Sequence, residues 1–314
     1  MSSSHQENYF GFLFLAKHFF VMVYAKLKSI GFIGIGVMGK HMVRNLMKNG
    51  YEVSIYSRTK SKAKEVIEEG AIWCDDIKSC VKDKDVVITI VGYPKDVEEV
   101  YFGGNGIIEN SNKGTILIDM TTTSPKLSER IYEEGMKKGL LALDAPVSGG
   151  DIGAKNGTLS IMVGGDEEVF AKALDVFKAM GTNIIYEGKA GAGQHTKMAN
   201  QIAIAGTIAG TCEAIAYGRA NGLDTRKMLD SISEGAAGSW QLKNNGKNIL
   251  DENLDPGFYI KHFIKDMKIA NDEAEGRKLS LDILKDVLKI YEELENEGMG
   301  DLGTQALIKH YESE

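Results

Sequence analysis

A lysine in the second half of the chain has two amide side chains at helical spacing from it. Lys197, Asn200 and Gln201 stand at positions i, i+3 and i+4 of an apolar stretch, so a helix there places them on one face. A lysine in a helix is ordinarily a solvated charge, but in a buried helix it needs partners or a purpose because burying a charge is costly. The chemistry open to such an ammonium group is proton transfer and stabilisation of a developing negative charge.

A glycine-rich turn over residues 34–39 stands where an apolar run gives way to an amphipathic stretch. In this GxGxxG pattern the first glycine permits a tight turn, the second lets a pyrophosphate approach the backbone, and the third lets helix and strand pack closely. Free N–H groups at the start of the helix then face the anion. A glycine turn that binds nothing is the alternative, but the strand before it and the helix after it favour a dinucleotide site. The predicted cofactor-binding residues here are Gly34, Gly36, Val37, Met38 and Gly39.

The segment after the second predicted strand lacks the acidic residue that binds the ribose hydroxyls of NAD. Ser57, Arg58 and Thr59 stand there instead, and a guanidinium between two hydroxyls suits a 2′-phosphate. A solvated turn before the next helix is the alternative. We predict NADP as the preferred cofactor, with NAD as the second choice.

A serine followed by two glycines forms a third candidate site. Ser148, Gly149 and Gly150 expose a hydroxyl and adjacent backbone N–H groups, which suit one carboxylate. Taken alone, the segment is also compatible with an ordinary loop.

The chain that must position these residues alternates between short apolar runs and amphipathic stretches from residue 29 to about residue 190. Such alternation predicts an α/β fold with a mostly parallel, doubly wound sheet of the Rossmann type. The expected strands are residues 30–35, 53–56, 86–91, 115–118, 140–143, 159–163 and 183–186, and the first helices are expected at residues 37–48 and 60–69.

Beyond residue 190 the strand patterns nearly cease. Residues 193–221 hold no proline and are rich in alanine and isoleucine, which predicts one long buried helix. Further helices are expected at residues 225–234, 262–275 and 283–298. We predict a dinucleotide-binding domain over residues 29–190 and an all-α C-terminal domain for substrate binding and oligomerisation over residues 191–314, joined by the long helix.

The composition narrows the classes of partner. Of the 314 residues, 43% are hydrophobic and 26% are charged, which is enough for two packed domains. A net charge of −7, without a basic stripe, argues against a nucleic-acid partner. Cys74, Cys80 and Cys212 show no paired spacing with each other or with histidines. We therefore expect neither a disulfide framework nor a metal site, and a cytoplasmic location.

Residues 1–28 stand apart from this pattern. The stretch over residues 10–24 is aromatic and apolar, but Lys17 and His18 interrupt it and it is too short to span a bilayer. We expect a leader segment that is vector-derived or precedes a natural start near Met22, with a weak membrane anchor as the alternative. No membrane partner is predicted.

Five blocks in order along the chain resemble the β-hydroxyacid dehydrogenases, the family of 3-hydroxyisobutyrate dehydrogenase and tartronate semialdehyde reductase. The resemblance runs from about Ile30 to the C-terminus, and it is specific because all five occur together. It implies a Rossmann-type domain, a long inter-domain helix, a helical C-terminal domain that forms a homodimer or homotetramer, and a catalytic cleft between the domains. The blocks are residues 31–39, 119–125, 144–150, 191–201 and 263–266.

The same resemblance implies roles for single residues. Lys197 matches the catalytic lysine, Thr122 lies in the motif near the nicotinamide and the substrate, and Lys265 matches a lysine that closes over the cofactor. Tyr93 and Pro94 stand where the family often has a Leu-Pro pair beside the cofactor. The loop Ser148-Gly149-Gly150 matches the substrate loop.

These roles predict hydride transfer between NADP(H) and a small β-hydroxyacid or semialdehyde carboxylate. Lys197 donates a proton to the developing alkoxide, and Asn200 or Gln201 holds the lysine and the substrate oxygen. Many members carry asparagine where this chain has Gln201, and the Asn-Gln pair is more similar to the tartronate semialdehyde reductases.

Three other functions remain open on this fold. Imine reductases share the architecture but usually have aspartate or tyrosine in place of the lysine. A 6-phosphogluconate dehydrogenase needs a larger helical domain and a phosphate site. A non-catalytic cofactor-binding module is the third alternative, because fold alone does not determine function.

Overall fold

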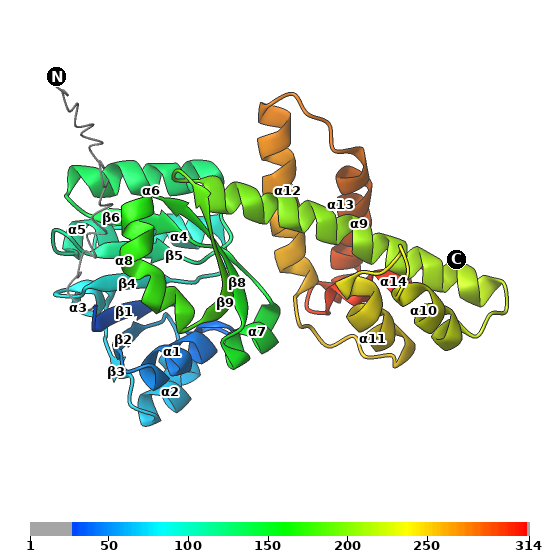
Figure 1. Cartoon of the computed structure of the whole chain (residues 1–314), viewed down its shortest axis with the longest axis horizontal. Coiled ribbons are helices and arrows are strands. Elements are labelled where there is room, and N and C mark those ends of the chain that lie inside the picture. The colour runs from blue at the N-terminus through cyan, green and yellow to red at the C-terminus, as the bar shows by residue number, and fades with distance from the viewer. Residues whose placement is uncertain (1–26, 313–314) are drawn as a thin grey trace, which may run out of the picture.

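The computed structural model describes residues 27–312, which form a sheet-containing N-terminal domain and a helical C-terminal domain (Figure 1). The predicted leader over residues 1–28 therefore lies almost wholly outside the described residues. Among the described helices, none is both long enough and apolar enough to cross a lipid bilayer.

The N-terminal domain is built on one sheet of nine strands in the order β3-β2-β1-β4-β5-β6-β8-β7, with β9 paired to β8. All neighbours are parallel except β6 with β8 and β7 with β8, so the predicted doubly wound, mostly parallel sheet is confirmed. The two shortest strands, β3 and β7, were not predicted. The strands are β1 Ser29–Ile33, β2 Glu52–Tyr56, β3 Ile72–Trp73, β4 Val86–Thr89, β5 Ile116–Asp119, β6 Leu141–Asp144, β7 Val147–Ser148, β8 Leu159–Gly165 and β9 Gly181–Gly188.

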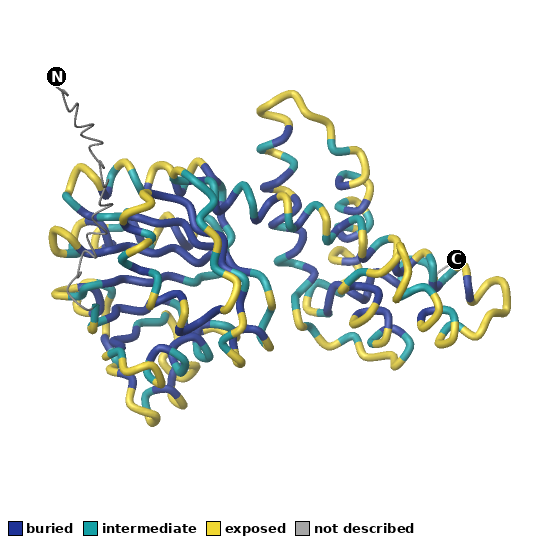
Figure 2. Tube along the Cα trace, in the orientation of Figure 1, coloured by how far each residue is buried: buried dark blue, intermediate teal, exposed yellow. Residues whose placement is uncertain are grey.

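Successive side chains of a strand point to opposite faces of the sheet. Both faces of this sheet are therefore apolar, and helices cover each of them. In β4, Val86 and Ile88 belong to the same apolar cluster as residues of α1 and α8, whereas Val87 belongs to the cluster on the other face, with residues of α3, α4, α5 and α6. All three are fully buried, and the central strands form the continuous buried region in Figure 2. The helical elements are α1 Gly39–Lys48, η1 Lys60–Ala63, α2 Lys64–Glu68, α3 Ile77–Val81, α4 Pro94–Phe102, α5 Ile107–Asn110, α6 Pro125–Lys137, α7 Gly150–Asn156 and α8 Glu167–Lys178.

The C-terminal domain is helical throughout its described length and has its own apolar core. The predicted long helix is α9, Ala192–Ala220, and the other predicted helices occur as α10, α12 and α13. The last of these ends earlier than predicted, at Leu294, where a π-helical turn follows. The remaining elements are α10 Thr225–Ser233, η2 Gln241–Asn245, α11 Gly246–Leu250, α12 Ile260–Gly276, α13 Asp282–Leu294, η3 Glu295–Met299, η4 Thr304–Leu307 and α14 Ile308–Glu312.

The first turn of α9 is tied to the sheet through a buried carboxylate. Asp144, the last residue of β6, accepts hydrogen bonds from the backbone N–H groups of Gly191 at 2.8 Å and Gln194 at 2.9 Å. Gly193 lies so close to β8 that a Cβ atom there would come within 2.4 Å of the Met162 carbonyl oxygen. A negative charge satisfies the otherwise unpaired N–H groups of a helix start, so Asp144 determines where α9 begins.

A second buried carboxylate lies beside the first. Asp119, at the end of β5, pairs in register with Asp144. Its Oδ1 atom accepts hydrogen bonds from the Thr89 hydroxyl at 2.8 Å and from the Thr121 N–H at 3.1 Å. Its Oδ2 atom has no hydrogen-bond partner among the described residues. Burial raises the pKa of Asp119 to about 6, despite the hydrogen bonds that favour the charged form.

We expect Asp119→Asn to flatten the pH dependence of stability. A carboxyl group whose pKa is raised by folding stabilises the protein at low pH, and this contribution is lost as pH rises from its unfolded pKa near 4 through about 6. The loss amounts to about 3 kcal/mol. Asparagine retains the Oδ1 acceptor and does not titrate. The free energy of unfolding by urea, measured at pH 4, 5, 6 and 7, tests this. The same pH dependence in the unmodified protein and in Asp119→Asn would contradict the prediction.

Candidate active site

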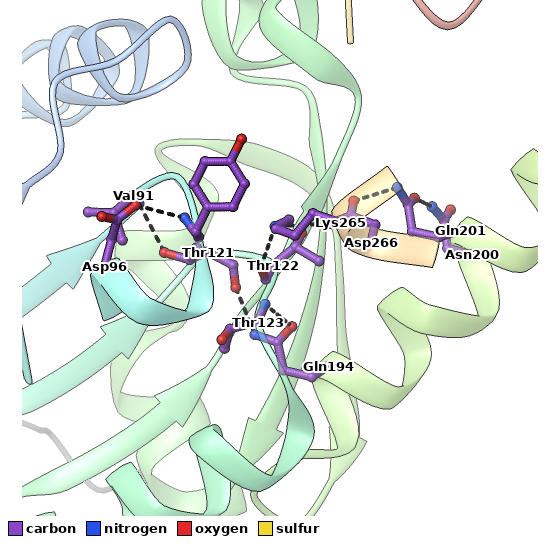
Figure 3. A network of polar contacts seen from close by, with 11 residues as sticks. Val91, Asp96, Thr121, Thr122, Thr123, Gln194, Asn200, Gln201, Lys265 and Asp266 are labelled. Carbon is purple, nitrogen blue, oxygen red and sulfur yellow. Dashed lines mark hydrogen bonds and ion pairs between the residues drawn. The ribbon is translucent and has the colours of Figure 1, made fainter. Parts of the chain in front are cut away.

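The segment after β5 is clamped by an amide from the first turn of α9. Gln194 Nε2 donates to the Thr121 carbonyl oxygen at 2.8 Å, and its Oε1 accepts from the Thr123 N–H at 3.0 Å. Figure 3 shows both bonds, and Gln194 is fully buried. Sequence reasoning assigned it no role, although its position three residues before Lys197, on the same helical face, was a usable signal.

Helix α12 reaches the same segment from the C-terminal domain. Lys265 Nζ donates to the Thr122 carbonyl oxygen at 2.6 Å and forms an ion pair with Asp266 Oδ1 at 2.9 Å. Lys126 on α6 and Glu273 on α12 form an ion pair between the domains at 3.5 Å. The predicted site residues Thr122 and Lys265 are therefore brought into direct contact, although they are 143 residues apart in sequence.

Asp266 also organises the two amides that follow Lys197. Gln201 Nε2 donates to Asp266 Oδ2 at 2.7 Å, and Gln201 Oε1 accepts from Asn200 Nδ2 at 2.7 Å (Figure 3). A carboxylate only accepts hydrogen bonds, so it determines which end of each amide faces which neighbour. The Gln201 amide is thus committed to Asp266 and Asn200, while the Oδ1 atom of Asn200 lies outside this chain of bonds.

Lys197 lies one turn earlier on α9 and is buried, with 7% of its surface exposed. The pKa of Lys197 is lowered to about 8, chiefly because burial removes the ammonium from water. The nearby Asp266 charge acts against this shift, and the Lys265 charge adds to it. Its ammonium group has no hydrogen-bond or ion-pair partner within residues 27–312. Such a group can give up or take a proton close to neutral pH.

The Ser148-Gly149-Gly150 loop lies where β7 ends and α7 begins. Gly149 and Gly150 have φ values of 126° and 63°, which a residue with a Cβ atom rarely adopts. A Cβ atom on Gly150 would lie 3.5 Å from the carbonyl oxygen of Gly257 in the C-terminal domain. The loop therefore faces that domain, and no described hydrogen bond joins it to the network around Lys265.

The glycine turn after β1 has the shape that a pyrophosphate requires. A Cβ atom on Gly34 would lie 2.0 Å from the Ile90 carbonyl oxygen, and one on Gly39 would lie 1.9 Å from the Gly34 carbonyl oxygen. Nothing lies within 4 Å of a Cβ atom on Gly36, so this glycine leaves open space rather than relieving a clash. Helix α1 begins at Gly39, two residues later than predicted, and no side chain caps it. Among residues 27–312, the Gly39 N–H has no hydrogen-bond partner, whereas the N–H groups of Lys40 and His41 donate to the Gly36 and Met38 carbonyl oxygens. An anion can therefore meet the Gly39 N–H at the start of the helix, and the turn fits a bound dinucleotide.

Arg58, beside Ser57 and Thr59 after β2, has a partner that the sequence did not reveal. Its side chain is 71% exposed, and its terminal nitrogen donates to Asp96 Oδ1 at 2.9 Å. Asp96 comes from the first turn of α4. A carboxylate is therefore present near the end of the second strand, but it comes from the helix that follows β4.

Tyr93 and Pro94 form the start of α4, with Tyr93 as the N-cap residue. The Tyr93 ring lies 5.4 Å from the His262 ring on α12, measured between ring centres. Tyr93 therefore contacts the C-terminal domain through its ring, which an aliphatic residue at this position lacks.

Two family models match the chain. One, the NAD binding domain of 6-phosphogluconate dehydrogenase, covers residues 29–188, and the other, NAD-binding of NADP-dependent 3-hydroxyisobutyrate dehydrogenase, covers residues 191–311. An uncharacterised oxidoreductase of Bacillus subtilis is 54% identical over 90% of this chain and 98% of its own length. The chain belongs to the β-hydroxyacid dehydrogenase family. The resemblance noted in the sequence is thereby confirmed.

Two further members have more specific names. The 2-hydroxy-3-oxopropionate reductase of Escherichia coli is 34% identical over 90% of this chain and 97% of its own. A solved 3-hydroxyisobutyrate dehydrogenase of Mycobacterium tuberculosis with L-serine has a TM-score of 0.84 and 28% identity over 90% of this chain and 98% of that one. Members of the β-hydroxyacid dehydrogenase family are NAD(P)-dependent oxidoreductases, and this chain has their cofactor-binding domains.

The imine reductases are more distant. The solved imine reductase of Myxococcus stipitatus with NAD+ has a TM-score of 0.61 at 18% identity, a likeness that concerns the fold alone.

Substitutions at Gly36 and Gly39 are expected to separate the effect of the glycine turn on stability from its effect on cofactor binding. Gly36→Ala is expected to leave the melting temperature within about 2 °C of the unmodified protein, because its Cβ atom meets nothing, but to weaken cofactor binding by about 10-fold or more. Gly39→Ala is expected to cost about 1–3 kcal/mol of unfolding free energy through its clash with the Gly34 carbonyl. Thermal melts and titration with NADPH test both. A Gly36→Ala protein that binds the cofactor normally would contradict the proposed position of the pyrophosphate.

Proposed function

We propose that this chain transfers a hydride between NADP(H) and a small β-hydroxyacid or semialdehyde carboxylate, with Lys197 as the proton donor and acceptor. The observation that carries the proposal is the buried, unpaired Lys197 ammonium, with its lowered pKa, beside a network that joins the two domains. The bound nicotinamide supplies or accepts the hydride. Lys197 stabilises the developing alkoxide and protonates it, so one group acts as general acid and as electrostatic stabiliser.

The other residues of the site hold the substrate. The Oδ1 atom of Asn200 has no partner among residues 27–312, and when a substrate is bound it can accept a hydrogen bond from the Lys197 ammonium or from a substrate hydroxyl. Gln201 fixes the orientation of Asn200. The Ser148 hydroxyl and the N–H groups of Gly149 and Gly150 bind the carboxylate at the far end of the substrate. Fixing the substrate at both ends orients its carbonyl carbon for reduction.

Two relatives support a short substrate. The E. coli relative is named for 2-hydroxy-3-oxopropionate, which is tartronate semialdehyde, and the M. tuberculosis structure contains L-serine. Both molecules are three-carbon acids with an oxygen at the third carbon. We take a tartronate semialdehyde type of substrate as the first candidate, supported by the Asn200-Gln201 pair, and 3-hydroxyisobutyrate as the second. Lys197 argues against imine reduction and against a non-catalytic module.

We also propose a preferred cofactor and an oligomeric assembly for this chain. Arg58 with Ser57 and Thr59 supports NADP over NAD, with Tyr93, Pro94 and Lys265 beside the cofactor. We further propose a domain boundary near residue 190, a homodimer or homotetramer built on the C-terminal domain, and a cytoplasmic location.

Lys197→Met should lower turnover by about 100-fold or more, the scale of a lost general acid that also stabilises charge. The dissociation constant for NADPH should change by less than about 3-fold, because methionine retains the volume and Lys197 serves the substrate oxygen. Stopped-flow turnover and NADPH titration test this. Near-normal turnover contradicts the assigned acid, and a collapse of cofactor binding makes the lysine structural.

The pH dependence should differ between the two reaction directions. Aldehyde reduction requires the Lys197 ammonium, so its kcat/KM should be level below pH about 8 and fall above it. Alcohol oxidation requires the neutral amine, so its kcat/KM should rise until pH about 8 and then level off. If kcat/KM changes in the same direction with pH in both reactions, the role of Lys197 as proton donor and acceptor is contradicted.

A carboxylate is expected to be required and a phosphate to be rejected. The loop of Ser148, Gly149 and Gly150 offers one anchor without an arginine, and a buried phosphate without a partner is costly. We expect kcat/KM to fall about 100-fold from tartronate, methylmalonate or succinate semialdehyde to their methyl esters, with 6-phosphogluconate inactive. Esters as good as the acids, or preference for the phosphosugar, would refute the substrate model without affecting the fold.

A further inference from the structure

The ion pair between Arg58 and Asp96 joins the segment after β2 to helix α4, which follows β4. Strand β1 lies between β2 and β4 in the sheet (Figure 1). Arg58 follows β2, and Asp96 lies in the helix that follows β4. The ion pair therefore connects the two segments that flank the glycine turn after β1, where the dinucleotide is proposed to bind.

The two partners differ in how firmly they are held. Asp96 is 5% exposed, and its Oδ2 atom accepts from the Tyr93 N–H at 3.0 Å while its Oδ1 atom accepts from Arg58 at 2.9 Å. Both carboxylate oxygens are thus occupied on the rigid first turn of α4. The Arg58 side chain is 71% exposed, so the buried Asp96 is the more constrained of the two partners.

The hydrogen bond to Asp96 leaves most of the guanidinium free. An arginine side chain carries several N–H donors in one plane, and a phosphate takes two of them side by side. Only one terminal nitrogen of Arg58 is engaged with Asp96. The neighbours of Arg58 in sequence are accessible as well, since Ser57 is half-buried and Thr59 is exposed.

We propose that Asp96 is a positioning residue that determines cofactor specificity. It holds Arg58 in the orientation in which its free N–H groups meet the 2′-phosphate of NADP, and it gives no such advantage to NAD, which carries a hydroxyl there. The proposal rests on the proposed NADP preference. If the Asp96 carboxylate instead competed with the phosphate for Arg58, removing this carboxylate would strengthen the binding of the 2′-phosphate.

The geometry favours positioning over competition. Asp96 is buried and both of its oxygens accept hydrogen bonds, whereas most of the Arg58 side chain is exposed to solvent. A phosphate can therefore bind Arg58 without displacing Asp96. Holding a long, exposed side chain in one conformation before the ligand arrives reduces the entropy lost on binding.

Binding of two nucleotide fragments tests the proposal without catalysis. Adenosine 2′,5′-bisphosphate and 5′-AMP differ only in the 2′-phosphate, and calorimetric titration of the full chain gives both dissociation constants. We expect Asp96→Asn to weaken bisphosphate binding about 5- to 10-fold and to change 5′-AMP binding less than about 2-fold. Glu99→Gln removes an exposed carboxylate from the same helix and is the matched control, with both constants unchanged.

The double variant identifies the route of the effect. Arg58→Ala should remove the preference for the bisphosphate, and adding Asp96→Asn to it should cause no further loss. Because Asp96 also accepts from Tyr93 at the start of α4, melting temperatures are measured for each variant. Asp96→Ser keeps an oxygen acceptor there and replaces Asp96→Asn if that variant does not fold.

The outcomes separate the two proposals. If the unmodified protein binds both fragments equally and Arg58→Ala changes neither constant, the NADP preference fails and the role of Asp96 fails with it. If the preference exists and depends on Arg58, but folded Asp96 variants bind the bisphosphate equally well or more tightly, only the positioning role is overturned. Additional loss in the double variant also overturns it, because Asp96 then acts by another route.

Discussion

The bond between the Asp144 carboxylate and the first turn of α9 is the interaction on which the rest of the site depends. Asp144 comes from the sheet, and the N–H groups of Gly191 and Gln194 begin the helix that carries Lys197. The close approach requires Gly193, because any side chain there would strike the Met162 carbonyl. The same first turn supplies Gln194, so one buried carboxylate sets the position of both the lysine and the clamp on residues 121–123.

Charge balance around Lys197 is arranged across the two domains. Burial favours the neutral amine, the Asp266 carboxylate favours the ammonium, and Lys265 opposes it. Because Lys265 is also bonded to the Thr122 carbonyl, the electrostatics of the lysine depend on how closely α12 approaches the N-terminal domain. Domain contact and proton affinity are therefore linked through a few side chains.

The cofactor side of the site follows a different physical logic. The glycine turn works through absent side chains, which allow close backbone packing at Gly34 and Gly39 and leave open space at Gly36. Arg58 instead carries a charge that is paired with a buried carboxylate on α4. We propose that shape serves the part common to both nicotinamide cofactors, and that this charge serves the part that distinguishes them.

The sequence by itself determined the features that depend on local periodicity and steric limits. The alternating apolar runs predicted the parallel sheet, the proline-free stretch predicted α9, and the spacing of Lys197, Asn200 and Gln201 placed them on one face. Short strands such as β7 escaped prediction because two residues carry no period. Only the tertiary structure decided that Asp266 binds Gln201 and that Asp96 holds Arg58. These partners are 65 and 38 residues apart, and contacts at such separations depend on strand order and domain packing, which local patterns do not encode.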